Sequence, residues 1–241
     1  MSKPLLCVVA ALLILLDGSG LAQNTSTSGV TFVGLSKYGI ELSGDPRAPT
    51  IVNRSTKKVL GYVLKFADAS GRGPVERILP LAAIHRGEAT QIGIAPGAER
   101  KAVITHEVIP PGGVAPRMYT RVILDAVLFE DGELVGPDTF EAFESMSTRL
   151  KAERDLAKLL LDSRTGAPAQ RDAAWSKIVQ LSKNDTNNVN SGAPPFTNTL
   201  YNFTQSTLAR DLLRARDTKG EAAAFDIAQK SSSLPTVWRN Q

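Results

Sequence analysis

Paired carboxylates are the one catalytic device that this sequence offers. Glu130, Asp131 and Glu133 surround a single Asp-Gly turn, and Asp125 precedes them within an apolar segment. Glycoside hydrolases use two carboxyl groups about 5–9.5 Å apart, one donating a proton while the other activates water or attacks the sugar. A carboxylate-based hydrolase that acts on polysaccharide is therefore one hypothesis, with either Asp125 or the Glu130–Glu133 cluster in its cleft. In the simpler interpretation, the three acids of the turn are only solvated.

Asp125 is the most unusual of these acids. Within Met118–Phe129 it alternates in phase with Ile123, Val127 and Phe129, so strand geometry predicts apolar neighbours on its face. The simpler interpretation is a polar position on the more hydrated face of a sheet, opposite Arg121.

The two histidines, His85 and His106, give little support for a metal site. Glu88 follows the first and Glu107 the second, so imidazole and carboxylate ligands for zinc or nickel are present. However, His85 and Glu88 are typical of a solvated loop. Glu107 points to the opposite strand face from His106, which shares its own face with apolar residues. A partly buried, hydrogen-bonded His106 is the favoured interpretation.

Motifs for other common chemistries are incomplete. Asn190-Ser191-Gly192 lacks the strand-turn-helix context of a nucleophilic serine, and Gly71-Arg72-Gly73-Pro74 lacks the Lys and Ser/Thr of a phosphate loop. The 130–133 turn lacks the spaced ligands of a calcium loop. We therefore assign no catalytic, cofactor-binding or metal-ligating residue, and no cofactor, from the sequence.

An apolar run near the start of the chain predicts export. Lys3 precedes the uninterrupted apolar run Leu5–Leu16, and a small-residue site follows that ends at Ala22. This order is typical of a secretory signal peptide over residues 1–22. As a helix the run would reach only about 18 Å, against a hydrocarbon core of about 30 Å. We expect a periplasmic or extracellular protein with no membrane span after cleavage.

The only cysteine, Cys7, lies in this predicted signal peptide. A mature chain beginning at Gln23 would therefore contain no thiol nucleophile, disulfide or thiolate metal site, which favours bacterial export. The net charge is +4, and no run of Lys and Arg is longer than two residues. Because nucleic-acid-binding proteins concentrate basic residues, we expect no nucleic-acid partner.

Short apolar segments separated by turn residues occupy residues 30–136, after a flexible polar lead-in at 23–29. Most segments alternate with a period of two and are rich in β-branched and aromatic residues, as strands are. Asp131-Gly132, between two apolar pairs, predicts a hairpin with a type I′ turn. Strands are expected at Val30–Leu35, Tyr38–Leu42, Thr50–Val52, Val59–Phe66, Thr90–Ile94, Lys101–Val108 and Met118–Phe129. Strands without intervening helices predict an antiparallel β-sandwich.

The hydrophobic period changes to that of helices after Pro137. Asp138 and Glu141 form the predicted capping pair of a long helix over about 139–163, and Pro168 begins a second helix. Two further helices are expected over about 199–217 and 221–230, so residues 137–241 form a region of three to four helices. The first helix carries an approximately heptad stripe of Phe143, Met146, Leu150, Ala157 and Leu160. Packing within the chain is the simpler role for this stripe, and partner binding or oligomerisation is the alternative.

Three stretches of the first half carry a resemblance. They are Ile51–Val59, which contains an Asn-x-Ser-x-Lys pattern, then Ala95-Pro96-Gly97, and Asp125–Gly132 with Gly136, which contains Phe-Glu-Asp-Gly. In these stretches the chain resembles immunoglobulin-like modules of uncharacterised secreted bacterial proteins. The resemblance covers residues 30–136 and implies an immunoglobulin-like sandwich, with no catalytic residue. The paired cysteines and core tryptophan of antibody domains are missing, because both tryptophans lie in the helical half.

The sequence thus predicts an α+β protein, with an N-terminal antiparallel immunoglobulin-like β-sandwich followed by an α-helical C-terminal segment. The leading hypothesis for function is an exported, non-enzymatic binding or structural module. Its partner would be a protein or glycan of the cell envelope, met through an exposed sheet face, a strand edge or the helix stripe. The rival hypothesis is the carboxylate-based hydrolase, acting on envelope polysaccharide. The identity of the partner, the strand order and the oligomeric state stay open.

Overall fold

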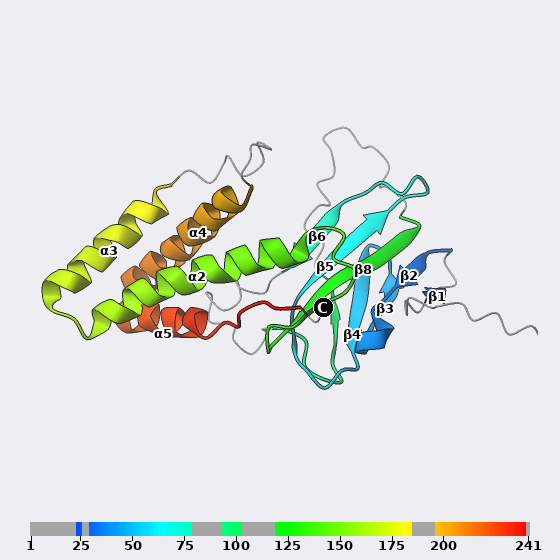
Figure 1. The fold of residues 1–241 in the computed structure, drawn as a ribbon, viewed down its shortest axis with the longest axis horizontal. Helices are drawn as coiled ribbons and strands as arrows, with labels where there is room; N and C mark the ends of the chain where they lie inside the picture. The colour runs from blue at the N-terminus through cyan, green and yellow to red at the C-terminus, as the bar shows by residue number, and fades with distance from the viewer. Residues whose placement is uncertain (1–22, 26–28, 79–92, 103–118, 185–195, 240–241) are drawn as a thin grey trace, which may run out of the picture.

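The computed structural model describes residues 23–25, 29–78, 93–102, 119–184 and 196–239. In these ranges all strands lie before residue 136 and all α-helices after residue 141, as Figure 1 shows. The predicted α+β class, with a β-rich N-terminal region and a helical C-terminal region, is confirmed. Gln23–Thr25, which the sequence places in a flexible lead-in, pair with the next strand.

The described strands form two sheets. The larger sheet has the order β1-β2-β8-β5-β6, with β9 also paired to β8, and the smaller has the order β3-β4-β7. The strands of the larger sheet are β1 (Gln23–Thr25), β2 (Thr31–Val33), β5 (Val59–Ala67), β6 (Val75–Ile78), β8 (Arg121–Phe129) and β9 (Leu134–Val135). Those of the smaller sheet are β3 (Ile40–Asp45), β4 (Ala48–Asn53) and β7 (Glu99–Lys101), and a 3₁₀ turn, η1 (Ser36–Tyr38), precedes β3.

One strand pair departs from the antiparallel arrangement that the sequence predicts. β2 lies parallel to β8, whereas every other pair between the described strands is antiparallel. Parallel strands need a long connection, and here the chain passes through both sheets between β2 and β8. The larger sheet is therefore mixed, and this strand order does not by itself make an immunoglobulin sandwich.

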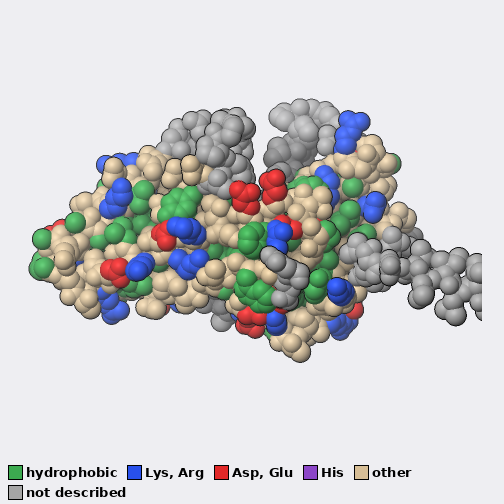
Figure 2. All heavy atoms as spheres, viewed as in Figure 1, with side chains coloured by type: hydrophobic (Ala, Val, Ile, Leu, Met, Phe, Trp, Pro, Cys, Tyr) green, Lys and Arg blue, Asp and Glu red, His purple; other side chains and the backbone are tan. Residues whose placement is uncertain are grey.

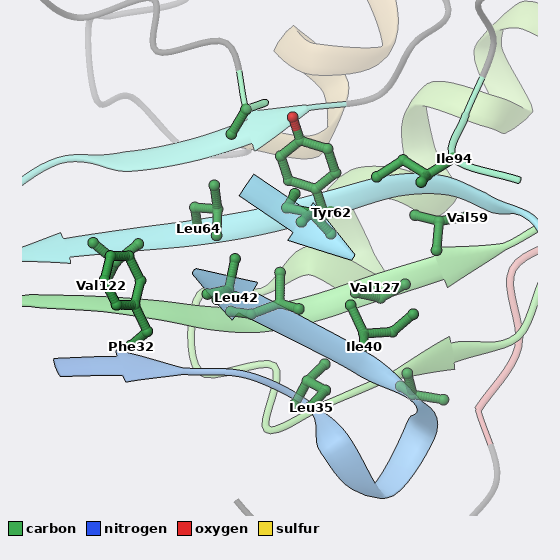
Figure 3. Packing of buried hydrophobic residues seen from close by; sticks show 14 of the residues in the cluster. Phe32, Leu35, Ile40, Leu42, Val59, Tyr62, Leu64, Ile94, Val122 and Val127 are labelled. Atoms are coloured by element: carbon green, nitrogen blue, oxygen red, sulfur yellow. The ribbon is translucent and has the colours of Figure 1, made fainter. Parts of the chain in front are cut away.

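The first core lies between the two sheets. Alternate side chains of the larger sheet face those of β3 and β4, because successive residues of a strand point to opposite faces. Figure 3 shows apolar side chains of both sheets meeting in this layer. Its buried members include Phe32, Leu35, Ile40, Leu42, Ile51, Tyr62, Leu64, Phe66, Val122, Leu124, Val127 and Phe129.

The opposite face of the larger sheet is also buried. Strand residues Val63, Ala126 and Leu128 form a second core with the first turns of helix α2 (Ala142–Arg164) and with Val237 near the C-terminus. In Figure 1 α2 runs from the sheet into the helical half, and the chain after α5 returns to the sheet. Neither face of the central strands is therefore an open binding surface.

The helical half is built around the rest of α2. It packs against α3 (Pro168–Ser182), α4 (Phe196–Lys219) and α5 (Glu221–Ser232), close to the positions that the period of 3.6 predicts. The third core contains Leu156, Ala157, Leu160, Trp175, Ile178, Leu208, Leu212 and Phe225. The proposed partner stripe is divided between two cores: Met146 and Leu150 face the sheet, and Ala157 and Leu160 face the helices. Packing within the chain is thus its role.

Two bulges between β5 and β8 change which residues share a face. Leu60 in β5 and Asp125 in β8 have no opposite residue in the pairing of the two strands. Each bulge inserts one extra residue and reverses the alternation beyond it. Leu60 therefore packs with Val63 in the second core, and not on the face of Tyr62, Leu64 and Phe66 that the sequence predicts.

No helix in the ranges that the structure describes is both long and apolar enough to span a membrane.

Candidate functional site

The turn between β8 and β9 holds three of the four acids that the sequence groups together. The Gly132 N–H donates to the carbonyl of Phe129 at 3.0 Å, and the Phe129 N–H donates to that of Glu133 at 2.9 Å. Gly132 has a φ of 90°, but Asp131 has no positive φ. The predicted hairpin is confirmed, but its turn is type I with a glycine bulge, because only one residue is left-handed.

A second segment, residues 53–58, brings a lysine to this turn. Asn53 is fully buried, and its side-chain amide donates to the carbonyl oxygens of Lys57 and Ile94 at 2.8 and 2.9 Å. Its Oδ1 accepts the N–H and the hydroxyl of Ser55. The Asn-x-Ser-x-Lys pattern is therefore a set of hydrogen bonds that fixes the backbone at Lys57.

The same segment is also joined to the turn through its backbone. Glu130 Oε1 accepts the Lys58 N–H at 3.1 Å, and the Glu130 N–H donates to the Lys58 carbonyl at 2.9 Å. Glu130 is thus used in joining two segments.

A third segment, residues 234–239, is here called the C-terminal tail. The Trp238 N–H donates to the Gly132 carbonyl at 2.9 Å, and the Leu134 N–H donates to the Trp238 carbonyl at 2.8 Å. The Trp238 indole N–H donates to the Asp131 carbonyl at 3.0 Å. The tail therefore lies against the hairpin and is joined to it by one parallel β-bridge, between Glu133 and Trp238.

Side chains from α2 and the preceding turn hold the rest of the tail. Arg154 donates to the carbonyl oxygens of Leu234 and Pro235 at 3.3 and 2.5 Å. Arg239 forms an ion pair with Asp138 and lies over the ring of Phe143, 4.4 Å from its centroid. The tail thus joins the helical half to the sheet at several points.

The three segments meet in what we call the tip cluster, which consists of Lys57, Phe129, Asp131, Glu133 and Trp238. The Lys57 ammonium lies 2.5 Å from Asp131 Oδ2 and 2.7 Å from Glu133 Oε2. It also lies 5.8 Å from the ring centroid of Phe129 and 6.0 Å from that of Trp238. Trp238 stays 39% exposed, one of two large apolar residues in the described chain that are left in solvent.

The charges of the tip cluster stabilise one another. Hydrogen bonds to Asp131 and Glu133 raise the pKa of Lys57 above its ordinary value. Burial alone would raise the pKa of Asp131, but the hydrogen bond from Lys57 and that from the Glu133 N–H bring it below its ordinary value. Lys57 and Asp131 are therefore both charged at neutral pH.

The lowered pKa of Asp131 bears on whether this residue could act as a general acid. Asp131 and Glu133 bind the same ammonium, so their bound oxygens lie within about 5 Å of each other, near the separation of glycosidase pairs. A general acid, however, needs a carboxyl group that stays protonated near neutral pH. The pKa of Asp131 moves the opposite way, so Asp131 does not suit the role of that acid.

Asp125 has a different position from the one that its alternation predicts. It is the extra residue of the β8 bulge, it is 2% exposed, and its carboxylate accepts the N–H groups of Thr139 and Phe140 at 3.1 Å each. Asp125 therefore faces the turn before α2, and not Arg121 on a hydrated sheet face. An acid placed there fixes the backbone of that turn.

The predicted capping pair of α2 is also altered. Asp138 accepts the Phe143 N–H at 3.1 Å, as a capping side chain does, but α2 begins only at Ala142. Glu141 is the residue before the helix, with a positive φ of 54° and no side-chain cap. Asp125 shapes this turn by accepting the N–H groups of Thr139 and Phe140. Because Asp125 lies more than ten residues before the turn, the sequence pattern around the turn gives no sign of this contact.

The other sequence candidates bring no further site. His85, Glu88, His106, Glu107 and Asn190-Ser191-Gly192 all lie outside the described residues. In the 71–74 turn, Asp68 accepts the N–H groups of Ser70 and Arg72, and Lys65 donates to the Gly73 carbonyl. That turn is thus held by its own hydrogen bonds. Among the described residues no three His, Cys, Asp or Glu side chains gather as metal ligands would.

Sequence reasoning missed Lys57 and Trp238. The Asn-x-Ser-x-Lys pattern is the signal that could have identified Lys57, because it specifies a fixed backbone there. Trp238 carries no local signal. Figure 2 shows acidic, basic and apolar side chains interspersed on the face in view. Neither the charge nor the apolar surface of this face therefore marks one region as a site.

Comparisons with protein-family models, with curated proteins and with solved structures find no match to this chain.

Proposed function

We propose that the protein is an exported, non-enzymatic binding module of the bacterial periplasm or cell exterior, and that the tip cluster is its contact surface. Its partner is a protein or glycan of the cell envelope. The proposal includes the signal peptide at residues 1–22 and an immunoglobulin-like class for residues 30–136. The two facing sheets around one core are compatible with that class, although the parallel β2–β8 pair is unusual for it.

One observation carries this proposal. Segments 53–58, 129–133 and 234–239 converge to hold an exposed tryptophan beside a lysine and two carboxylates. The exposed part of the Trp238 ring gains nothing from burial, whereas aromatic residues are enriched where proteins bind partners. Two of the other surfaces suggested by the sequence are already occupied within the chain, since the helix stripe is buried and the tail bonds to the hairpin beside β9.

The experiment that tests this proposal compares two exposed apolar side chains. Purified protein is used to capture partners from envelope extracts, as the wild type and as the variants Trp238→Ala and Leu159→Ala. Leu159 on α2 is 38% exposed, so it matches Trp238 in exposure but lies outside the tip cluster. We expect one partner to be retained by the wild type and by L159A and lost with W238A.

Two results would overturn the proposal. Retention of the same partner by W238A would place the contact surface elsewhere, and an absence of any specific partner would remove the binding role. In the second case, loss of saccharide hydrolysis in Asp131→Asn or Glu133→Gln would favour the rival hydrolase.

A further inference from the structure

The tip cluster places one positive charge directly beside two negative ones, which bears on what it binds. Lys57 lies within hydrogen-bonding distance of both carboxylates, Asp131 and Glu133. A cationic ligand would compete with this tethered ammonium, and an anionic ligand would meet the two carboxylates. A neutral ligand meets neither obstacle, so the arrangement favours a neutral ligand.

The cluster nevertheless keeps hydrogen-bonding capacity. A carboxylate has about four acceptor positions and an ammonium has three donors, so the contacts described leave some of each for a ligand. The side chains of Lys57 and Asp131 are 38% and 39% exposed, so water or a ligand can reach them. Hydroxyl groups both donate and accept, and they therefore suit a surface that presents donors beside acceptors. Since internal bonds already fix these side chains, binding loses little side-chain entropy.

Trp238 adds a flat apolar surface to these polar groups. Its indole N–H is bound to the Asp131 carbonyl, and its neighbour Val237 is buried, so the ring is fixed in orientation. The centres of protein–protein hot spots are desolvated apolar pockets. Here a single ring is bordered by charges, which suits a ligand that is apolar on one face and rich in hydroxyls at its edge.

We infer that the tip cluster binds a neutral saccharide chain, with one sugar ring packed against Trp238 and its hydroxyls on Asp131, Glu133 and Lys57. The C–H groups on the face of a pyranose supply the apolar surface, and its equatorial hydroxyls point outward toward the carboxylates. This inference rests on the proposed function, because it names the partner class of the same surface.

The test uses the chain's two tryptophans as reporter and control. Each indole N–H gives its own proton–nitrogen NMR peak, and W238F assigns them. Trp175 donates its indole N–H to Glu221 in the helical half, and so lies outside the tip cluster. Neutral oligosaccharides of β-linked N-acetylglucosamine, β-glucose and α-glucose are titrated into the purified protein. We expect at least one to shift the Trp238 peak in a saturable manner and to leave the Trp175 peak unchanged.

Variants separate stacking from hydrogen bonding. Affinities of the variants are measured by titration calorimetry, because W238A and W238F lack the Trp238 peak. We expect W238A to weaken binding of that saccharide at least about tenfold, as loss of a central aromatic contact does. W238F keeps an aromatic ring and is expected to retain more affinity than W238A. D131N is expected to weaken binding, while an unchanged Trp175 peak shows that the helical half is intact. L159A is expected to bind as the wild type does.

Saccharides that leave the Trp238 peak unmoved would overturn this inference. If W238A still abolished retention of an envelope protein in the capture experiment, the proposed function would stand with a protein partner. If W238A changed neither experiment, both proposals would fail. Binding that survives W238A and D131N would show that the saccharide binds elsewhere on the chain.

Discussion

Two clusters in this molecule combine a lysine, a carboxylate and an aromatic ring, and they are built in different ways. In the helical half Lys151 binds Asp155 at 2.5 Å and lies 5.3 Å from the ring centroid of Tyr201, whose hydroxyl donates to Asp155 at 2.7 Å. Lys151 and Asp155 are one turn apart on α2, so the helix alone places them together. We call Lys151, Asp155 and Tyr201 the helix cluster.

The tip cluster has similar groups but no such local support. Lys57 and Asp131 are separated by 74 residues, and Asp131 and Trp238 by 107. Its geometry exists only when the hairpin, the 53–58 segment and the tail are all in place. The comparison teaches that similar contacts can form within one half of the molecule or depend on the whole fold. Only the second kind reports on how the two halves are joined.

The largest expected effect comes from disturbing the tail where it crosses the hairpin. Gly132 and Gly220 both have a φ of 90°, but a Cβ on Gly132 would lie 2.0 Å from the Thr236 carbonyl oxygen, and one on Gly220 would meet nothing within 4 Å. We expect Gly220→Ala to lower the free energy of unfolding by about 1–2 kcal/mol through backbone strain. Gly132→Ala must also displace the tail, and we expect roughly 3 kcal/mol or more.

Urea unfolding measures both glycine variants, and the Trp238 indole peak reports whether the tail is still docked. Equal losses of stability with an unchanged Trp238 peak in G132A would show that the tail contributes little to joining the halves.

A smaller difference is expected between the two lysines. Lys151→Met removes an exposed helical pair, which is typically worth about 0.3–0.5 kcal/mol. Lys57→Met leaves Asp131 and Glu133 facing each other with no cation between them, so we expect a larger fall in Tm and a moved Trp238 peak. Thermal unfolding of both variants at low and high salt tests this. A fall in Tm for K57M no larger than that for K151M would make the tip cluster as local as the helix cluster.

Acid affects both clusters in the same direction, more weakly than loss of the lysine. Interactions with Lys57 hold the pKa of Asp131 below its ordinary value, and those with Lys151 and Tyr201 do the same for Asp155, in each case against burial. Each group therefore adds stability above its unfolded pKa, and this is lost as pH falls through the lower folded pKa. We expect the Trp238 peak to move in that acid range in the wild type. In D131N the Trp238 peak should not move in this pH range. A peak that moves in D131N as it does in the wild type would contradict the prediction.

Local patterns in the sequence predict much of the fold but little of the site. Hydrophobic periods place the long strands and the helices, and Asp131-Gly132 marks the hairpin, since each signal depends on neighbouring residues. The bulge at Asp125 shows where this approach stops: one extra residue reverses the alternation, and it is specified by pairing with a distant strand. The short strand β6, at Val75–Ile78, which directly follows the turn at residues 71–74, was also not predicted from the sequence.

The candidate site is harder to predict for the same reason. The acids of the turn are visible in the sequence, but their partner Lys57 and the neighbouring Trp238 come from segments that only the tertiary fold brings together. The parallel β2–β8 pair likewise depends on the path of the chain through both sheets.

The smallest expected effect belongs to the hydroxyl of the helix cluster. Burial, with the hydrogen bond to Asp155 and its charge, raises the pKa of Tyr201 to about 12. A raised pKa means that the neutral hydroxyl adds stability below the unfolded pKa of about 10, and that this is lost as pH rises through 12. We expect Tyr201→Phe to lower the free energy of unfolding by about 0.5–1 kcal/mol at pH 7. Its absorbance titration should also lose one tyrosine that ionises near pH 12, while the Trp238 peak is unaffected. Since the helix cluster depends only on α2 and α4, a shift of the Trp238 peak in Y201F would show instead that the two clusters are coupled through α2 and the tail.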